Sequence, residues 1–307
     1  MKKIKESSGV SMPYIMLSEE DEQLLLDIHL HIYVDIEYIL EKSYRGYAKT
    51  ALYRRLKRME EAGYIKHEYL PVPSVRGKKR KSGRPINVYT LTKFGVEMVK
   101  ELRGIVHWNQ RWTDRVATFV YHSLMLAHTE SAMYSYSQTE TLYELKEWIN
   151  EPRATYKYTK SAKDILRPDG IAVVGRKGVS ARNAGLLLEM ERSYSTKEVL
   201  LKKVLRYNDF FKRGEEMVKK YELQVGFDYP IVLWKLIWIA RDETRKKELL
   251  RHLQDAEQPP LYEIERDGET IYKQRYDILI TTYDEVLKNP FGEIYVDLSD
   301  PTLPCGL

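Results

Sequence analysis

Apolar residues at the start of the chain recur with the spacing of short, capped helices. Ser18 is a good N-cap, and acidic residues follow it in the first turn, where the helix dipole favours negative charge. The apolar positions after it are three to four residues apart, as on one helix face. They are Leu24, Leu25, Ile28 and Ile32. The pattern predicts a first helix beginning after Ser18.

Two more helices are predicted before residue 64. Asp35 is expected to cap a short second helix, and Gly46 lies in the following turn, where glycine can adopt a positive φ. A third helix is expected from about Tyr47 to Ala62, with Gly63 ending it. Its apolar stripe, which should pack on the first two helices, consists of Leu52, Leu56 and Met59.

The third predicted helix has a second face that is polar and basic. It carries Lys49, Thr50, Tyr53, Arg54 and Lys57, and Arg45 precedes it in the turn. Side chains of these types hydrogen-bond to base edges and phosphates, so this helix is predicted to enter the major groove of duplex DNA. A solvated basic face on a structural helix is the alternative interpretation.

A basic, glycine-containing segment follows between two predicted strands, Tyr64–Leu70 and Ile86–Leu91. Its basic residues are Arg76, Lys78, Lys79, Arg80, Lys81 and Arg84. The order of strand, basic loop and strand predicts a hairpin wing that grips the DNA backbone or minor groove, with binding that weakens as salt rises. A linker with a localisation-like basic cluster is the alternative. Thr92 is expected to cap the next helix.

The distribution of charge supports a polyanionic partner. Residues 1–40 carry three basic and eight acidic residues, whereas residues 41–100 carry sixteen basic and five acidic residues. The whole chain has a net charge of only +5, so the excess of positive charge lies in this second segment. Such a concentration is typical of a surface that binds nucleic acid, and double-stranded DNA is the expected main partner.

The pattern changes after residue 102. A linker is predicted, then a long helix beginning near Trp112, then alternating strands and helices. Strands are expected at 141–149, 155–158, 170–174, 185–190, 229–240 and 276–282, and helices at 195–221, 242–253 and 283–287. The helix at 195–221 is expected to be continuous.

The predicted fold class is α+β, in which an N-terminal winged helix-turn-helix precedes an α/β domain with a mixed sheet. The expected organisation is a flexible N-terminus at 1–17, a DNA-binding domain at 18–102, a second domain at 103–300 and a tail at 301–307.

Three carboxylates are expected to meet at one end of the second domain's sheet. Asp169 precedes one predicted strand, and Glu189 and Glu191 share one face of the next. Converging carboxylates suit Mg²⁺ or Mn²⁺ and phosphoryl chemistry, so these three are candidate catalytic residues, and Asp169 and Glu189 are candidate metal ligands. A solvated cluster paired with Arg192 and Arg206 is the alternative.

The order of Pro168, Asp169, a strand and Glu189 resembles the PD-(D/E)xK nuclease core. In that core a lysine stands two positions after the glutamate, where this chain has Glu191. Arginine at 192 does not readily lose a proton, so the candidate replacements are Lys197, Lys202 and Lys203. It remains open whether the domain is an active nickase or nuclease, or a non-catalytic fold that binds DNA or a partner.

The order of motifs along residues 18–297 resembles the bacterial replication-relaxation family. The motifs are TALYRRLKRMEEAGYI, YTLTKFG, RWTDRVATFVYHSL, RPDGIAVV, LLLEMERSYSTKEVLLKKVLRYNDFF, IVLWKLIWIARDETRKKELL and ILITTYDEVLKNPFGEIYVDL. The resemblance implies a plasmid or mobile-element protein that acts in replication, mobilisation or DNA relaxation. A winged-helix transcriptional regulator whose second domain oligomerises or senses a ligand is the alternative function.

Other signals limit the remaining classes. No apolar run approaches the roughly 20 residues that span a bilayer, so no membrane partner is expected. The one cysteine, Cys305, excludes an intrachain disulfide, and a cytoplasmic location is expected. His29 and His31 are two residues apart on a helix and point in different directions, so no metal site is predicted there. A homodimer, formed through the helix from Trp112 to Ala132, and other replication or mobilisation proteins are further expected partners.

Overall fold

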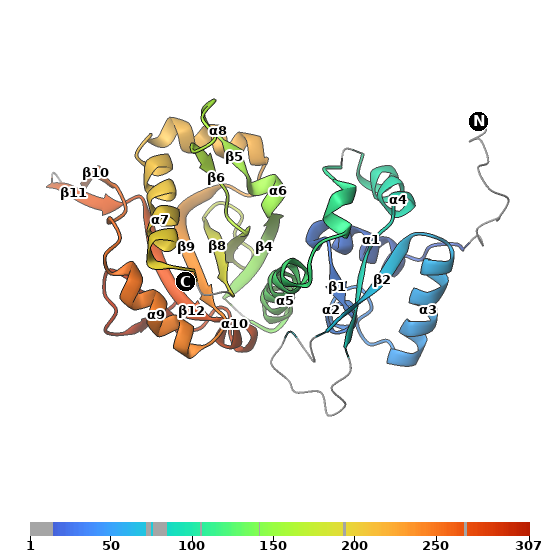
Figure 1. The fold of residues 1–307 in the computed structure, drawn as a ribbon. Coiled ribbons are helices and arrows are strands. Elements are labelled where there is room, and N and C mark those ends of the chain that lie inside the picture. The colour runs from blue at the N-terminus through green and yellow to red at the C-terminus, as the bar shows by residue number, and fades with distance from the viewer. Residues whose placement is uncertain are drawn as a thin grey trace. The chain divides into compact units, whose positions relative to one another are not determined.

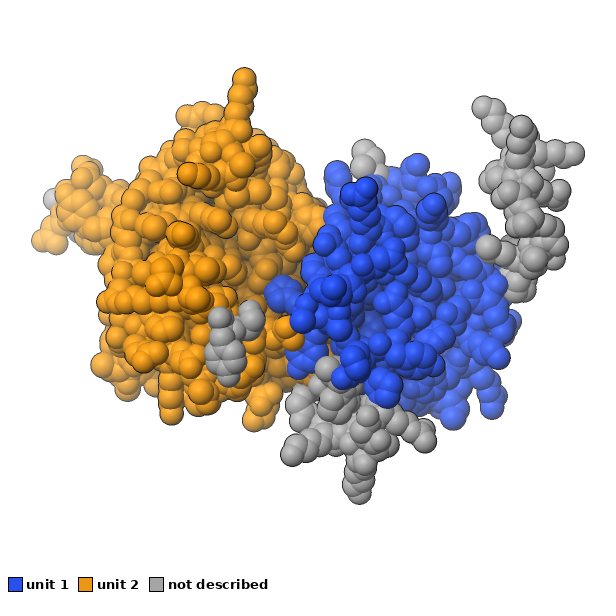
Figure 2. Space-filling view, in the orientation of Figure 1, with its two compact units in different colours: residues 1–73, 80–123 blue, residues 74–79, 124–307 orange. Residues whose placement is uncertain are grey.

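The computed structural model describes residues 15–71, 75, 85–104, 106–140, 142–192, 195–266 and 269–307. The chain forms two compact units, which are residues 1–73 with 80–123 (unit 1) and residues 74–79 with 124–307 (unit 2) (Figure 2). Helix α5 (Ala117–Thr139) includes residues of both units. Across the described ranges, no helix is long and apolar enough to span a membrane.

Unit 1 consists of helices and a small antiparallel sheet of strand order β1-β3-β2 (Figure 1). Its elements are α1 (Glu19–His31), β1 (Val34–Asp35), α2 (Ile36–Glu41), α3 (Lys49–Glu61), β2 (Ile65–Leu70), β3 (Ile86–Leu91), α4 (Lys93–Arg103) and the 3₁₀ turn η1 (Gln110–Thr113).

The helix ends of unit 1 follow from capping residues and glycines. The hydroxyl of Ser18 accepts the Asp21 amide, and the Asp21 carboxylate accepts the Ser18 amide at 2.8 Å, which is a reciprocal capping box. Asp35 accepts the Tyr38 amide at the start of α2. Gly46 and Gly63 have φ values of 84° and 78°, a region that favours glycine. The predicted caps and turns are therefore confirmed.

The core of unit 1 contains residues of both α1 and α3. Leu24, Leu25 and Ile28 of α1 are fully buried, and so are the three predicted stripe residues of α3, Leu52, Leu56 and Met59. Burial of apolar side chains on this scale provides most of the driving force for packing helices together. Ile32 is also buried, but it ends α1 as the C-cap with a φ of 68° instead of continuing the helix.

Unit 2 alternates helices and strands after the last residues of α5. Its elements are β4 (Tyr143–Asn150), α6 (Glu151–Ala154), β5 (Tyr156–Lys157), β6 (Ile165–Leu166), β7 (Gly170–Arg176), β8 (Asn183–Glu191), α7 (Lys197–Phe211), α8 (Glu215–Val225), β9 (Ile231–Ala240), α9 (Glu243–Leu253), β10 (Leu261–Arg266), β11 (Glu269–Gln274), β12 (Tyr276–Thr282), α10 (Tyr283–Lys288), β13 (Tyr295–Asp297) and β14 (Pro304–Cys305).

The main sheet of unit 2 is mixed, with strand order β14-β13-β12-β9-β8-β7-β4. Strands β4, β7 and β8 form antiparallel pairs, whereas β8, β9 and β12 are parallel. One core cluster joins sheet residues such as Leu187 and Trp238 to Leu200 of α7, Tyr221 of α8 and Leu249 of α9. The predicted α+β class with a mixed sheet is confirmed.

Two helix predictions are wrong. The helix expected at 195–221 is broken: α7 ends at Phe211 and α8 begins at Glu215, because Gly214 adopts a φ of 85° that no helix interior allows. Near Trp112 the chain forms the 3₁₀ turn, and α5 begins only at Ala117. There the Asn109 side chain accepts the Arg111 amide, and this local hydrogen bond competes with a regular helix.

The sequence patterns also did not predict the β10–β11 hairpin. Its two strands pair with each other and not with the main sheet, and Figure 1 shows the hairpin extending away from the rest of unit 2.

Candidate functional site

The six residues predicted to contact DNA from the turn and helix α3 are all exposed. They are Arg45, Lys49, Thr50, Tyr53, Arg54 and Lys57. Lys57 lies 3.8 Å from Glu61 in a solvent-exposed pair, which contributes little energy. Within the described part of the chain, Arg45, Lys49 and Arg54 form no ion pair. Helix α3 therefore presents cations that no described residue of its unit neutralises.

The amino end of α3 is suited to an anion. Its N-cap is Ala48, which provides no side-chain hydrogen bond, and its first turn contains no acidic residue. Helix α1 differs, because it has a capping box and four acidic residues in its first turn. Free amide groups and the positive end of the helix dipole favour a bound phosphate or carboxylate.

Arg55 is a residue of α3 that the sequence analysis did not single out. Its Nε lies 2.9 Å and 3.0 Å from the two carboxylate oxygens of Asp21, and its Nη2 donates to the Met16 carbonyl at 2.7 Å. Burial would raise the pKa of Asp21, but the hydrogen bond from Arg55 and others lower it overall. Arg55 thus fixes α3 to α1. Its spacing of three from Leu52 was a signal of this inward position.

The six basic residues of the predicted wing, Arg76, Lys78, Lys79, Arg80, Lys81 and Arg84, lie outside the described residues. Strands β2 and β3 on either side are described and pair from Ile65↔Leu91 to Leu70↔Ile86. This register places Leu70 and Ile86, which lie on either side of the basic segment in the sequence, opposite each other.

A second group of polar residues lies where β7 begins and β8 nears its end. The Asp169 amide donates to the Leu188 carbonyl at 2.9 Å, and Asp169 Oδ2 accepts the Met190 amide at 2.7 Å. Because Gly170 pairs with Leu188, the same antiparallel register places Asp169 beside Glu189. Asp169 is half-buried, so part of this group is open to solvent.

Glu189 is buried, and each of its carboxylate oxygens has a partner on α7. Its Oε2 lies 2.6 Å from Lys203 Nζ, and its Oε1 accepts the Tyr207 hydroxyl at 2.6 Å, with both partners on α7. Burial raises the pKa of Glu189, which Lys203 opposes. Burial also disfavours the Lys203 ammonium, but Glu189 and Asp169 raise its pKa overall. Of the three candidate lysines, Lys203 is the one that reaches this position.

Glu191 does not join this group. Its carboxylate accepts hydrogen bonds from the Ser195 hydroxyl at 2.9 Å and from Arg245 Nη2 at 3.1 Å, and Arg245 is itself buried. Among the described residues, no three or more His, Cys, Asp or Glu side chains are grouped to hold a metal ion. The alternative of a solvated cluster is wrong, because Glu189 and Glu191 are both buried.

The carboxylates of Asp169 and Glu189 nevertheless suit a hard cation such as Mg²⁺ in their number. Mg²⁺ is commonly bound by one or two carboxylates together with water and substrate phosphates. Asp169 and Glu189 provide two adjacent carboxylates, and one is half-exposed. Arg192 is partly exposed and Arg206 is exposed.

Comparison with known proteins identifies one family. The model of the replication-relaxation family matches residues 36–222, which is more than half of the chain. No curated protein matches the chain. Among the similar solved structures are those of restriction endonuclease FokI and of restriction endonuclease FokI bound to DNA, with 11% identity each and TM-scores of 0.31 and 0.27. The comparison covers 88% of this chain but only 43% and 44% of those two chains. On the family match, the chain belongs to the replication-relaxation family.

Proposed function

We propose that this protein binds double-stranded DNA of a plasmid or other mobile element and acts in its replication or mobilisation. Family membership supports the setting. The observation that carries the DNA-binding part is the two-sided character of α3, with Leu52, Leu56 and Met59 buried on one side and unneutralised cations on the other. A helix of this kind is suited to the major groove.

Residues 18–102 would be a winged helix-turn-helix domain, and residues 103–300 a second, nuclease-like domain. Helices α1, α2 and α3 followed by the β2–β3 pair have the element order of a winged helix. The six basic residues between β2 and β3 would form the wing and contact phosphates.

A gel-shift assay with duplex fragments that tile the encoding replicon tests DNA binding. The double variant Arg54→Glu/Lys57→Glu should lose binding, because it places two carboxylates against the phosphates. The matched control is Lys93→Glu/Lys100→Glu on α4, which makes the same change of charge at exposed positions of unit 1 and should keep affinity. Retained binding by the α3 variant would overturn the proposal.

A second candidate function is metal-dependent nicking of DNA, which the grouping of Asp169, Glu189 and Lys203 favours. A divalent cation held by Asp169 and Glu189 would neutralise charge on a phosphate. Lys203, whose side chain is partly exposed, would offer a second positive charge beside it. In this chain the lysine would thus come from α7. The position two residues after Glu189, where the nuclease core has its lysine, is Glu191.

Supercoiled plasmid incubated with the protein and Mg²⁺ or Mn²⁺ tests this second function. The expected result is nicked circular DNA, which Asp169→Asn should abolish. Asp209→Asn, an exposed carboxylate on α7, is the matched control and should nick as before. Absence of nicking, or equal nicking by Asp169→Asn, would refute the enzymatic function and leave DNA binding untouched.

A further inference from the structure

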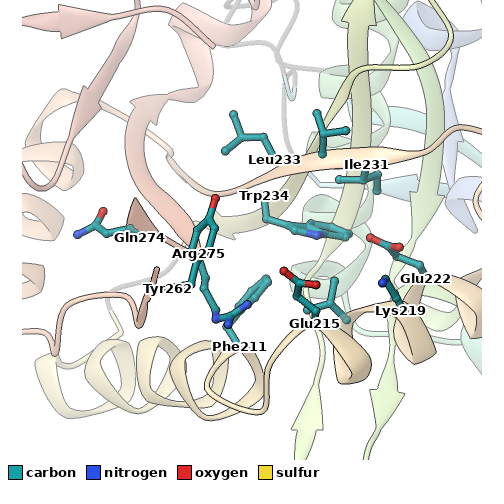
Figure 3. A pocket seen from close by; sticks show the side chains of 12 residues that line it. Phe211, Glu215, Lys219, Glu222, Ile231, Leu233, Trp234, Tyr262, Gln274 and Arg275 are labelled. Carbon is teal, nitrogen blue, oxygen red and sulfur yellow. The ribbon is translucent and has the colours of Figure 1, made fainter. Parts of the chain in front are cut away.

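A pocket of about 230 Å³ opens in unit 2 beside the amino end of β9 (Figure 3). Phe211 and Trp234 provide aromatic walls from the core. The indole of Trp234 packs on the backbone of β8 at Gly185, where an added Cβ would lie 2.6 Å from the ring. The floor of the pocket is therefore fixed by core packing and needs no ligand to form.

The strand beside this pocket has an open edge. Pairing of β9 with β12 begins at Trp234↔Tyr276, and the Arg275 amide instead donates to the Pro260 carbonyl at 2.9 Å. On this side, Ile231–Leu233 therefore have no strand partner in the described part of the chain. An open edge is a template for pairing with another chain.

Apolar side chains surround the open edge. Val232 is 65% exposed and Leu233 is 39% exposed, although both belong to a strand of the main sheet. On α8, Leu223 is 82% exposed, one residue after the pocket-lining Glu222. A group of exposed apolar residues rimmed by polar ones is typical of a protein contact surface.

Charges of both signs form the rim of the pocket. They are Glu215, Lys219 and Glu222 of α8 and Arg275 before β12. The Arg275 guanidinium lies over the Tyr262 ring, 5.3 Å from its centroid. Among the described residues none of these four charges belongs to an ion pair. Two cations and two carboxylates balance each other, so neither a nucleic acid strand nor a strongly basic partner is favoured.

We propose that this β9-edge surface, made of Ile231–Leu233, Leu223 and the four rim charges, binds the same surface of a second copy of the chain. In a two-fold dimer this surface of one copy contacts the same surface of the other copy. Because its rim has two cations and two carboxylates, the cations of one copy can face the carboxylates of the other. The apolar residues would form the dry centre of the contact. This proposal does not depend on DNA binding.

Sedimentation equilibrium of the full chain tests the dimer. The wild type should dimerise, and two variants, Lys219→Glu/Arg275→Glu and Glu215→Lys/Glu222→Lys, should each dimerise at least about tenfold more weakly, equal to about 1.4 kcal/mol. A mixture of the two variants should form heterodimers, because opposite charges then face each other. Glu243→Lys/Lys247→Glu on α9, which follows the far end of β9, is the control and should dimerise normally.

Circular dichroism and thermal unfolding check that each variant folds. Val232→Arg, at an exposed position of the same edge, gives a second disruption without entering the core. A wild type that stays monomeric, or a dimer that survives both charge variants and Val232→Arg, would overturn the proposal. The latter result would also be expected of a dimer formed through another surface, such as α5.

Discussion

Lys203 Nζ lies 2.6 Å from Glu189 Oε2, although the two residues belong to different elements, α7 and β8. The lysine also lies over the ring of Trp238 on the neighbouring strand, 5.5 Å from its centroid. A carboxylate as buried as Glu189 is stable in its charged form only if cations or donors surround it. The Lys203–Glu189 pair therefore contributes to the stability of unit 2 and also belongs to the candidate catalytic group.

The first prediction concerns that pair. Lys203→Met should lower the free energy of unfolding by about 2 to 4 kcal/mol, because it leaves the buried carboxylate without its cation. Lys202→Met, at the exposed neighbouring position, should change it by no more than about 0.5 kcal/mol. Urea unfolding of the two variants provides the measurement. Equal stability of both would show that Glu189 is neutral in the folded protein.

The second prediction concerns pH and Asp21. Its folded-state pKa is lowered, so its stabilising contribution is present above the unfolded value of about 3.9 and is lost as the pH falls through the folded value. Asp21→Asn should therefore destabilise unit 1 at pH 7, by about 2 to 4 kcal/mol, and much less near pH 2.

Thermal unfolding of Asp21→Asn at several pH values checks this dependence. Glu19→Gln in the same helical turn is the control, because Glu19 is exposed. A destabilisation by Asp21→Asn that is as large near pH 2 as at pH 7 would mean that Arg55 is not bonded to a charged carboxylate.

The third prediction concerns the break between α7 and α8. Gly214→Ala should lower the free energy of unfolding by about 1 to 3 kcal/mol, because φ of 85° with ψ of −177° is a region almost restricted to glycine. No atom lies within 4 Å of the added methyl group, so a loss of stability reflects backbone strain and not a clash. Gly306→Ala, also in open space and without a positive φ, is the control. An unchanged melting temperature for Gly214→Ala would argue that α7 and α8 can join into one helix.

The fourth prediction concerns the salt dependence of DNA binding. Lys49 at the amino end of α3 should contact a phosphate, so Lys49→Ala should reduce the slope of log affinity against log salt by about 1. Fluorescence anisotropy over a salt series gives the slope. Lys93→Ala on α4 should leave it unchanged, and a reduction of the same size in that control would indicate a general charge effect instead of a contact.

Local signals were sufficient for much of unit 1. Ser18, Asp35 and Gly63 act within three or four residues of their own positions, so their effects can be predicted without a tertiary structure. The buried stripe of α3 follows from its helical period in the same way. The same helical period puts Lys49 and Arg54 outside that stripe of α3, where they are exposed.

Long-range contacts account for what the sequence did not predict. Lys203 was one of three candidate lysines, and it is the one whose place on α7 brings it to Glu189 of β8. Lys197 instead pairs with Asp255, and Lys202 is exposed. Glu191 appeared equivalent to Glu189 by spacing, but Arg245 of α9 binds it separately. The hairpin was missed because none of its described positions is buried: Leu261–Glu265 alternate only between exposed and half-buried side chains.

The parallel pairing of β8 with β9 has a consequence for how the chain folds. Two whole helices, α7 and α8, separate these strands, so a long loop must close before the strands can form hydrogen bonds. Contacts between distant segments slow folding, and β2 and β3 are separated only by residues 71–85, without an intervening helix of the described chain. On a ribosome, unit 1 can complete its helices and hairpin while the partner strands of the larger sheet are still being synthesised.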